Sequence, residues 1–417
     1  MQVNIDRVSK DFEIIVSYTK TPEKGCTRFS YSAEDKKARE YLLRQMEQLG
    51  LSIKVDAIGN IRAKYGDMEK PSIMIGSHID TVKNGGKYDG LTGVLAGLEV
   101  IRVLKEENVQ LSHPVELIIF AEEEGSNFGI TLLGSKVLTG KYELEDLKLI
   151  KNGDGKALYD VAKGFGLEIE NIKRDVLKKN EVDTMIELHI EQGAVLESKN
   201  KSIGIVQAIA GMKTFKVSLN GISNHAGTTP MYLRSDPMVG ASHIISHIQK
   251  AANEMALPTT VATVGKIDCR PNMGNVIPGN VEFLVDIRDV EPQGINFIAN
   301  ELRNKVEEIS SKYSLSSEIK LIGESEVVKL SPKIIDTIEQ AAIEHGYSYM
   351  RMNSGAVHDA VMLTELADVG MIFIPSAGGK SHCPEEYTSM EEIKLGCDLL
   401  LNVVLSLVCK EDKLNIV

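Results

Sequence analysis

The sequence has 417 residues, of which 43% are hydrophobic and 25% charged, and its formal net charge is −12 at pH 7. This length and composition predict a globular protein of two or three domains with a well-covered core. The net negative charge and the lack of a dense lysine and arginine block exclude nucleic acid and a membrane surface as expected main partners.

Short strands and helices alternate through the first part of the chain. Residues 1–18 predict a helix, and this amphipathic, charged start is unlike a signal peptide. A second helix is expected to begin at Ser32, because a serine followed three residues later by an acid resembles a capping box. Two short strands are expected between residues 53 and 64. The apolar run at 71–76, bounded by proline and glycine, then predicts a buried strand that ends at His78.

The residues after this buried strand can bind or orient a cation. His78 and Asp80 follow the strand directly, and Asp89 comes just before a helix predicted over 91–107. A histidine and an aspartate at neighbouring ends of buried elements make a plausible first pair of metal ligands. Taken alone, His78 and Asp80 could equally form an ordinary turn at a strand end.

The next two predicted strands also end in polar side chains. The strand over 115–121 leads into three adjacent acids, Glu122–Glu124, which repel one another unless cations lie among them. A third strand, over 183–191, carries His189. A solvated acidic turn and a core histidine are the alternatives, but the repeated pattern favours one shared site.

The chain changes character near Gly211 and changes back near residue 327. Residues 213–220 alternate between polar and apolar, as expected for a sheet with one wet face. With the predicted helices and strands that follow, this indicates an α+β insert at 212–326. The remaining parts, 1–211 and 327–417, would form one α/β catalytic domain with a mixed sheet.

The last predicted strand, over 370–375, leads into a glycine-rich loop that carries His382. A closing helix begins with a capping box at Ser389. Mixed imidazole and carboxylate ligands suit Zn²⁺, Mn²⁺ or Co²⁺ better than Ca²⁺ or Mg²⁺, which favour oxygen alone. One bridging carboxylate could hold two such ions, and a second, free carboxylate could then act as a base.

Nine motifs in the order of one family connect these segments. They are GSHIDTV, GGKYDG, FAEEEGSNFG, HIEQG, SNHAGTTPM, RPNMGNVIPG, VDIR, SGAVHDA and GGKSHCPEE, from about residue 59 to 387. The sequence resembles the M20 metallopeptidase clan and, within it, the hydantoinase/carbamoylase branch of N-carbamoyl-L-amino-acid hydrolases and allantoate amidohydrolases. This resemblance implies a phosphorylase/hydrolase-like catalytic domain, a ferredoxin-like lid and dimerisation domain, and a homodimer.

The resemblance also implies two divalent metal ions, Zn²⁺, Mn²⁺ or Co²⁺, in each subunit. His78, Asp89 and His189 would hold one ion. The other would be held by Asp89, Glu124 and His382, so that Asp89 bridges the pair.

Further roles follow from the same resemblance. Asp80 would orient His78, and Glu123 would take a proton from the attacking water and pass it to the leaving nitrogen. His225 would stabilise the tetrahedral oxyanion. The implied substrate-binding residues are Gln192, His225, Asn275, Arg288, Gly378 and Gly379.

The predicted activity is hydrolysis of a ureido C–N bond in an N-carbamoyl-L-amino acid or allantoate, with release of CO2 and ammonia. The alternatives are a dipeptidase, aminopeptidase or aminoacylase of the same clan, and a non-catalytic protein that binds a metal or an amino acid. Lys380 stands where the family commonly has an apolar residue, which leaves the substrate open. Five scattered cysteines do not suggest a disulfide framework, so we expect a cytoplasmic location.

Some individual positions have structural alternatives. His225 could be a turn histidine, and Arg288 could be a surface arginine at a strand end. His358 could contact substrate or be structural. His243 and His247 lie four residues apart, but a packed or dimer-facing helical stripe is the favoured interpretation.

Overall fold

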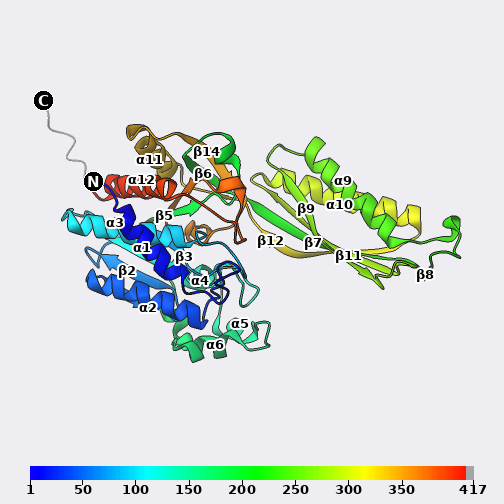
Figure 1. Ribbon diagram of the computed structural model, residues 1–417, viewed down its shortest axis with the longest axis horizontal. Helices are drawn as coiled ribbons and strands as arrows, with labels where there is room; N and C mark the ends of the chain where they lie inside the picture. The colour runs from blue at the N-terminus through cyan, green and yellow to red at the C-terminus, as the bar shows by residue number, and fades with distance from the viewer. Residues whose placement is uncertain (410–417) are drawn as a thin grey trace. The chain divides into compact units, whose positions relative to one another are not determined.

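The computed structural model describes residues 1–409, and its internal contacts divide the chain into two units (Figure 1). The first unit combines Met1–Gln207 with the chain from Leu330 onward, and the second is Ala208–Lys329. The predicted insert spans 212–326, and its role as a lid and dimerisation domain remains a prediction. No helix within residues 1–409 is long and apolar enough to cross a membrane.

The first unit is built on a mixed sheet with the order β1-β2-β4-β3-β5-β15-β6, in which β14 also pairs with β6. The central strands β4, β3, β5 and β15 are parallel, whereas β1 pairs antiparallel with β2, β2 with β4, and β6 with β15. These strands are β1 (Ser52–Val55), β2 (Ile61–Tyr65), β3 (Ser72–His78), β4 (Val115–Phe120), β5 (Val182–Ile190), β6 (Ile203–Ile209), β14 (Tyr349–Ser354) and β15 (Asp368–Ile374). The mixed α/β fold predicted from the sequence is confirmed.

Helices cover the central strands of this sheet. The helix α3 packs on β3, β4 and β5, α12 on β5 and β15, and α11 on β15, while α1 packs on α3. The bounds of the helices are α1 (Ile5–Val16), α2 (Ala33–Gln48), α3 (Leu91–Glu106), α4 (Leu133–Leu138), α5 (Leu144–Leu149), α6 (Leu158–Phe165), α7 (Ile172–Asp175), α8 (Val195–Ser198), α11 (Pro332–Glu344) and α12 (Met390–Val408). Of these helices, α12 also contacts α3 and α11, and every residue of β3 and β4 is buried.

Both predicted capping residues begin helices. The Ser32 hydroxyl accepts a hydrogen bond of 3.2 Å from the Asp35 backbone N–H at the start of α2. At the start of α12, Ser389 and Glu392 form a full capping box, in which each side chain accepts from the other's backbone N–H. These bonds satisfy donors that the first turn of a helix leaves unpaired.

A buried arginine fixes the chain just beyond β3. Arg28 is 1% exposed, and its Nε donates to the Ile79 carbonyl at 2.8 Å while its Nη1 donates to the Ile15 carbonyl at 3.0 Å. Its backbone N–H donates to the Thr81 hydroxyl at 2.9 Å. Arg28 therefore links the segment that follows His78 to the end of helix α1.

The second unit is a four-stranded antiparallel sheet in the order β12-β7-β11-β9, with α9 and α10 packed on it. In chain order its elements run βαββαβ, the ferredoxin-like arrangement. The bounds are β7 (Gly211–Asn220), α9 (Pro237–Glu254), β9 (Val261–Arg270), β11 (Asn280–Asp289), α10 (Pro292–Tyr313) and β12 (Ser316–Ser325). Buried aromatic and aliphatic side chains, including Phe215, Ile244, Phe283 and Leu302, form its core. A small ribbon, β8 (Asn224–His225) with β10 (Val276–Ile277), completes it.

The fold depends on a glycine in β3. Gly76 has φ +146°, and a Cβ atom there would lie 1.9 Å from the Ile118 carbonyl oxygen of β4. We predict that Gly76→Ala lowers the free energy of unfolding by about 2–4 kcal/mol, because the clash and the backbone strain add. Urea unfolding of the metal-free protein measures this. Gly153→Ala is the matched control, because a Cβ atom there meets nothing within 4 Å. Equal unfolding midpoints for the two variants would contradict the prediction.

Candidate metal centre

Three parallel strands, the start of a helix and a loop carry the predicted metal ligands. Parallel strands end at the same edge of a sheet, where open α/β sheets bind their ligands. β3 ends at His78, Glu124 follows β4, and His189 lies near the end of β5. Asp89 comes just before α3, and His382 lies between β15 and α12. The structure brings all five side chains together in two overlapping trios.

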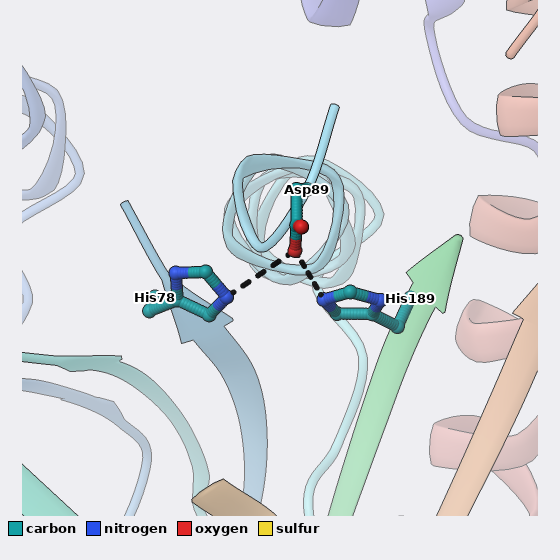
Figure 2. Close-up of side chains that lie close together, drawn as sticks. All are labelled: His78, Asp89 and His189. Atoms are coloured by element: carbon teal, nitrogen blue, oxygen red, sulfur yellow. Dashed lines mark ion pairs between the residues drawn. The ribbon is translucent and has the colours of Figure 1, made fainter. Parts of the chain in front are cut away.

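The first trio is His78, Asp89 and His189. Figure 2 shows the two imidazoles on either side of Asp89, whose Oδ1 lies 3.5 Å from His78 Nε2 and 3.1 Å from His189 Nε2. The Nδ1 atoms lie 3.1 Å and 2.9 Å from the backbone carbonyls of Asp80 and Ile190, so they donate protons there. In their neutral form, both imidazoles would therefore direct an Nε2 lone pair toward the Asp89 carboxylate. A cation among these atoms removes the repulsion.

The second trio is Asp89, Glu124 and His382. His382 Nε2 lies 3.1 Å from Asp89 Oδ2 and 3.4 Å from Glu124 Oε2. Asp89 therefore directs one oxygen to each trio, which is the arrangement of a carboxylate able to bridge two ions. The His382 side chain is half-exposed, whereas Asp89 and Glu124 are nearly buried, so the second trio opens toward solvent.

The electrostatics of the buried acids favour bound cations. Within residues 1–409, the ion pairs of Asp89, Glu123 and Glu124 are all with histidines. Burial raises the pKa of Glu123 well above its usual value and that of Glu124 to about 8. Burial also raises the pKa of Asp89, but hydrogen bonds from the three neighbouring histidines outweigh it and hold that pKa well below its usual value. Divalent ions would neutralise these acids and leave the imidazoles unprotonated, so the donor set fits them.

Glu123 lies beside the first trio without belonging to either one. Its Oε2 is 3.8 Å from His78 Nε2, and the residue is buried. The Asp80 carboxylate accepts hydrogen bonds from the backbone N–H groups of Glu123, at 3.2 Å, and of Glu124, at 3.1 Å. The Asp80 carboxylate lies 3.7 Å from His78 Nδ1, beyond hydrogen-bond distance. The hydrogen bond to that imidazole is made instead by the backbone carbonyl of Asp80. Asp80 thus fixes the segment of the two glutamates as well as the histidine.

Of the predicted pocket residues of the first unit, Gln192 contacts the second trio, whereas Gly378 and Gly379 lie in the loop that leads to His382. Gln192 Nε2 donates to Asp89 Oδ2 at 2.8 Å, while its Oε1 is buried without a hydrogen-bond partner among the described residues. Gly378 and Gly379 both have positive φ, and the Gly378 N–H donates to Glu197 at 2.9 Å. A Cβ atom at Gly379 would lie 2.7 Å from the Ala194 backbone nitrogen, so this loop requires glycine.

Three predicted site residues belong to the second unit. His225 is exposed on β8, and its Nδ1 accepts from the Gly227 N–H at 3.0 Å. Asn275 comes just before β10, and its carbonyl accepts from the Ala226 N–H at 3.0 Å. His225 and Asn275 are therefore neighbours in one small ribbon. Arg288 lies on β11 with its Nε 2.8 Å from Asp286 Oδ1.

The other histidines have structural partners. The buried His358 ring lies 4.7 Å from the His189 ring, centroid to centroid, and its Nε2 is 3.0 Å from the Ser354 hydroxyl. This favours the structural alternative for His358. His243 Nε2 lies 2.7 Å from the Tyr313 hydroxyl, and His247 Nε2 lies 2.8 Å from Glu301. Both contacts join α9 to α10, as expected for a packed helical stripe.

Sequence reasoning did not single out three polar residues next to the ligands. Glu187 is fully buried and accepts from the Ser77 hydroxyl at 2.6 Å. Ser381 and Glu386 contact Asp89 from the His382 loop. Glu386 is the last residue of the motif GGKSHCPEE, but neither the motif nor its spacing of four residues from His382 predicts which groups it contacts.

Comparisons with known proteins agree with this geometry. A family model described as peptidase family M20/M25/M40 matches residues 74–406. An N-carbamoyl-L-amino-acid amidohydrolase of Paenarthrobacter aurescens is 36% identical over 385 residues, covering 92% of this chain and 93% of that protein. An allantoate amidohydrolase of Escherichia coli K12 is 35% identical over 386 residues, with 92% and 93% covered. The crystal structure of a hydantoinase/carbamoylase family amidase from Burkholderia multivorans matches with a TM-score of 0.91 at 31% identity, covering 98% of this chain and 99% of that one. The chain belongs to the M20/M25/M40 peptidase family and, like these relatives, is an amidohydrolase acting on C–N bonds.

Proposed function

We propose that this enzyme hydrolyses the ureido C–N bond of N-carbamoyl-L-amino acids or allantoate, releasing CO2 and ammonia. The main support is that two trios of potential metal ligands share Asp89, while the Glu123 carboxylate lies beside them and belongs to neither trio. The names of the relatives supply the substrate class, since two of them act on N-carbamoyl amino acids and allantoate.

We propose two divalent ions in this centre, Zn²⁺, Mn²⁺ or Co²⁺. His78, Asp89 and His189 would hold one, and Asp89, Glu124 and His382 the other. When bound, such ions act as Lewis acids that polarise the substrate carbonyl and lower the pKa of water. The mixed nitrogen and oxygen donors favour these metals over Ca²⁺ and Mg²⁺.

Glu123 is the proposed general base. Its buried carboxylate lies 3.8 Å from an imidazole of the first trio and has no side-chain hydrogen bond among the described residues, so it is available to a water molecule. It would accept a proton from the attacking water and deliver it to the leaving nitrogen. Asp80 would hold the Glu123 backbone during both transfers.

The remaining proposed residues bind the substrate. His225 would donate to the developing oxyanion, while Asn275 and Arg288 would bind the substrate carboxylate. Gln192, Gly378 and Gly379 would line the pocket beside the second trio. The homodimer through the second unit and the cytoplasmic location expected from the sequence remain predictions.

Removal of metal should abolish turnover. We predict that metal-stripped enzyme releases no ammonia and that adding Mn²⁺, Zn²⁺ or Co²⁺ restores release from a ureido substrate but not from dipeptides. Bound ions should also raise the melting temperature, because binding to the folded state stabilises it by about 4 kcal/mol at a thousand times Kd. The assay uses N-carbamoyl amino acids, allantoate, ureidoglycolate and dipeptides. Turnover that persists below one ion per chain, or that requires a peptide bond, would overturn the proposal.

Loss of the proposed base should separate chemistry from metal binding. We predict that Glu123→Gln lowers kcat by on the order of 10²-fold or more, because the amide cannot accept the proton of water. Metal content, measured by mass spectrometry, should stay at the wild-type value, because Glu123 lies outside both trios. A variant that retains wild-type turnover would remove Glu123 from this role.

Loss of the proposed oxyanion donor should lower kcat without changing the metal content of the enzyme. We predict that His225→Ala lowers kcat by about 10²-fold with normal metal content, since one donor to an oxyanion contributes about that factor. His113→Ala is the matched control, because His113 precedes β4 at the opposite end of that strand from Glu124. Normal hydrolysis by His225→Ala would exclude the assignment.

A further inference from the structure

A buried carboxylate lies directly behind Asp89. Glu386 is 3% exposed, and its Oε1 accepts hydrogen bonds from the backbone N–H groups of Tyr88, at 2.8 Å, and of Asp89, at 3.1 Å. Its Oε2 accepts from the Ser381 hydroxyl at 2.7 Å. Glu386 therefore uses both oxygens to hold the two loops on which Asp89 and His382 lie.

The loop before Asp89 is shaped to this carboxylate. A Cβ atom at Gly86 would lie 2.0 Å from both Cδ and Oε1 of Glu386, so only glycine allows the approach. The two segments are 297 residues apart in the chain, as counted between Asp89 and Glu386. A contact this close fixes where the Asp89 backbone stands relative to the His382 loop.

The same carboxylate also acts on the side chain of Asp89 through Ser381. The Ser381 Oγ lies 3.2 Å from Asp89 Oδ2 and 2.7 Å from Glu386 Oε2. A hydroxyl group has a single proton, so it donates to one carboxylate at a time, and the shorter distance favours Glu386. The Asp89 Oδ2 lone pairs then remain available to the second trio.

We propose that Glu386 is a positioning residue for the metal centre, which holds the Asp89 backbone and, by accepting the Ser381 proton, leaves the Asp89 Oδ2 lone pairs free to bind an ion. The inference rests on the metal centre proposed above. Groups that orient metal ligands from behind typically change metal affinity by 10–100-fold when they are removed. Because Glu386 acts through the metal ligand Asp89, we expect its removal to lower the affinity for metal ions more than it changes any other property.

The test measures Mn²⁺ binding without substrate, by electron paramagnetic resonance of the free ion. We expect Glu386→Ala to weaken Mn²⁺ binding by about 10–100-fold. Glu386→Gln should lie between Glu386→Ala and the wild type, because its amide oxygen still accepts from both backbone N–H groups while its amide nitrogen no longer accepts from Ser381. Glu385→Ala is the matched control, because Glu385 is exposed and one residue away, and it should bind Mn²⁺ like the wild type.

A purely structural role gives a different result. In that case Glu386→Ala would melt at a lower temperature in the metal-free form, and its folded fraction would bind Mn²⁺ with wild-type affinity, which would overturn the proposal. If Glu386→Ala does not fold, Glu386→Gln decides in the same way, since equal affinity again contradicts it. Because no substrate is present, a wrong substrate class leaves these results unaffected. Failure of the wild type to bind Mn²⁺ would instead refute the metal centre itself.

Discussion

The structure depends on how one buried aspartate divides its two oxygens. Asp89 Oδ1 faces His78 and His189, while Oδ2 faces His382. Glu123 is buried and Glu124 nearly buried nearby, and no lysine or arginine pairs with any of these acids in residues 1–409. Burying several carboxylates is costly unless positive charge accompanies them. The arrangement is therefore best understood as a binding site in which divalent ions supply the missing charge.

The backbone around this site is strained at several points. Glu122, Gln192 and His382 all have positive φ although none is glycine, and each lies beside or among the metal-binding side chains. Such conformations cost about 1–3 kcal/mol each and persist where the surrounding structure enforces them. Hydrogen bonds hold two of these positions. Glu122 accepts from the backbone N–H groups of Asn127 and Phe128, and the Gln192 N–H donates to the Ser376 hydroxyl.

Many of the strands, helix starts and metal-binding side chains could be predicted from the sequence. Some of the features that could not be predicted depend on contacts between distant parts of the chain. Apolar runs bounded by turn residues predicted β3, β4, β5 and β15, and a serine with an acid three residues on predicted two helix starts. The strands β6 and β14 were not predicted. β14 alternates apolar and polar residues only over 350–353, which is too short a stretch to predict a strand, and β6 lies near the boundary of the insert. The partners of Asp80 and Glu386 could not be predicted either, because those hydrogen bonds join segments that are distant in the chain.

The central claim is that Asp89 is shared between two cations. The most direct measurement is an anomalous-difference map from crystals of the enzyme grown with Mn²⁺ and recorded near the manganese absorption edge. We expect two peaks roughly 3.5–4 Å apart, each beside a different oxygen of Asp89. One peak would lie among His78 and His189, and the other beside Glu124 and His382. A single peak, or a pair that Asp89 does not contact, would contradict it.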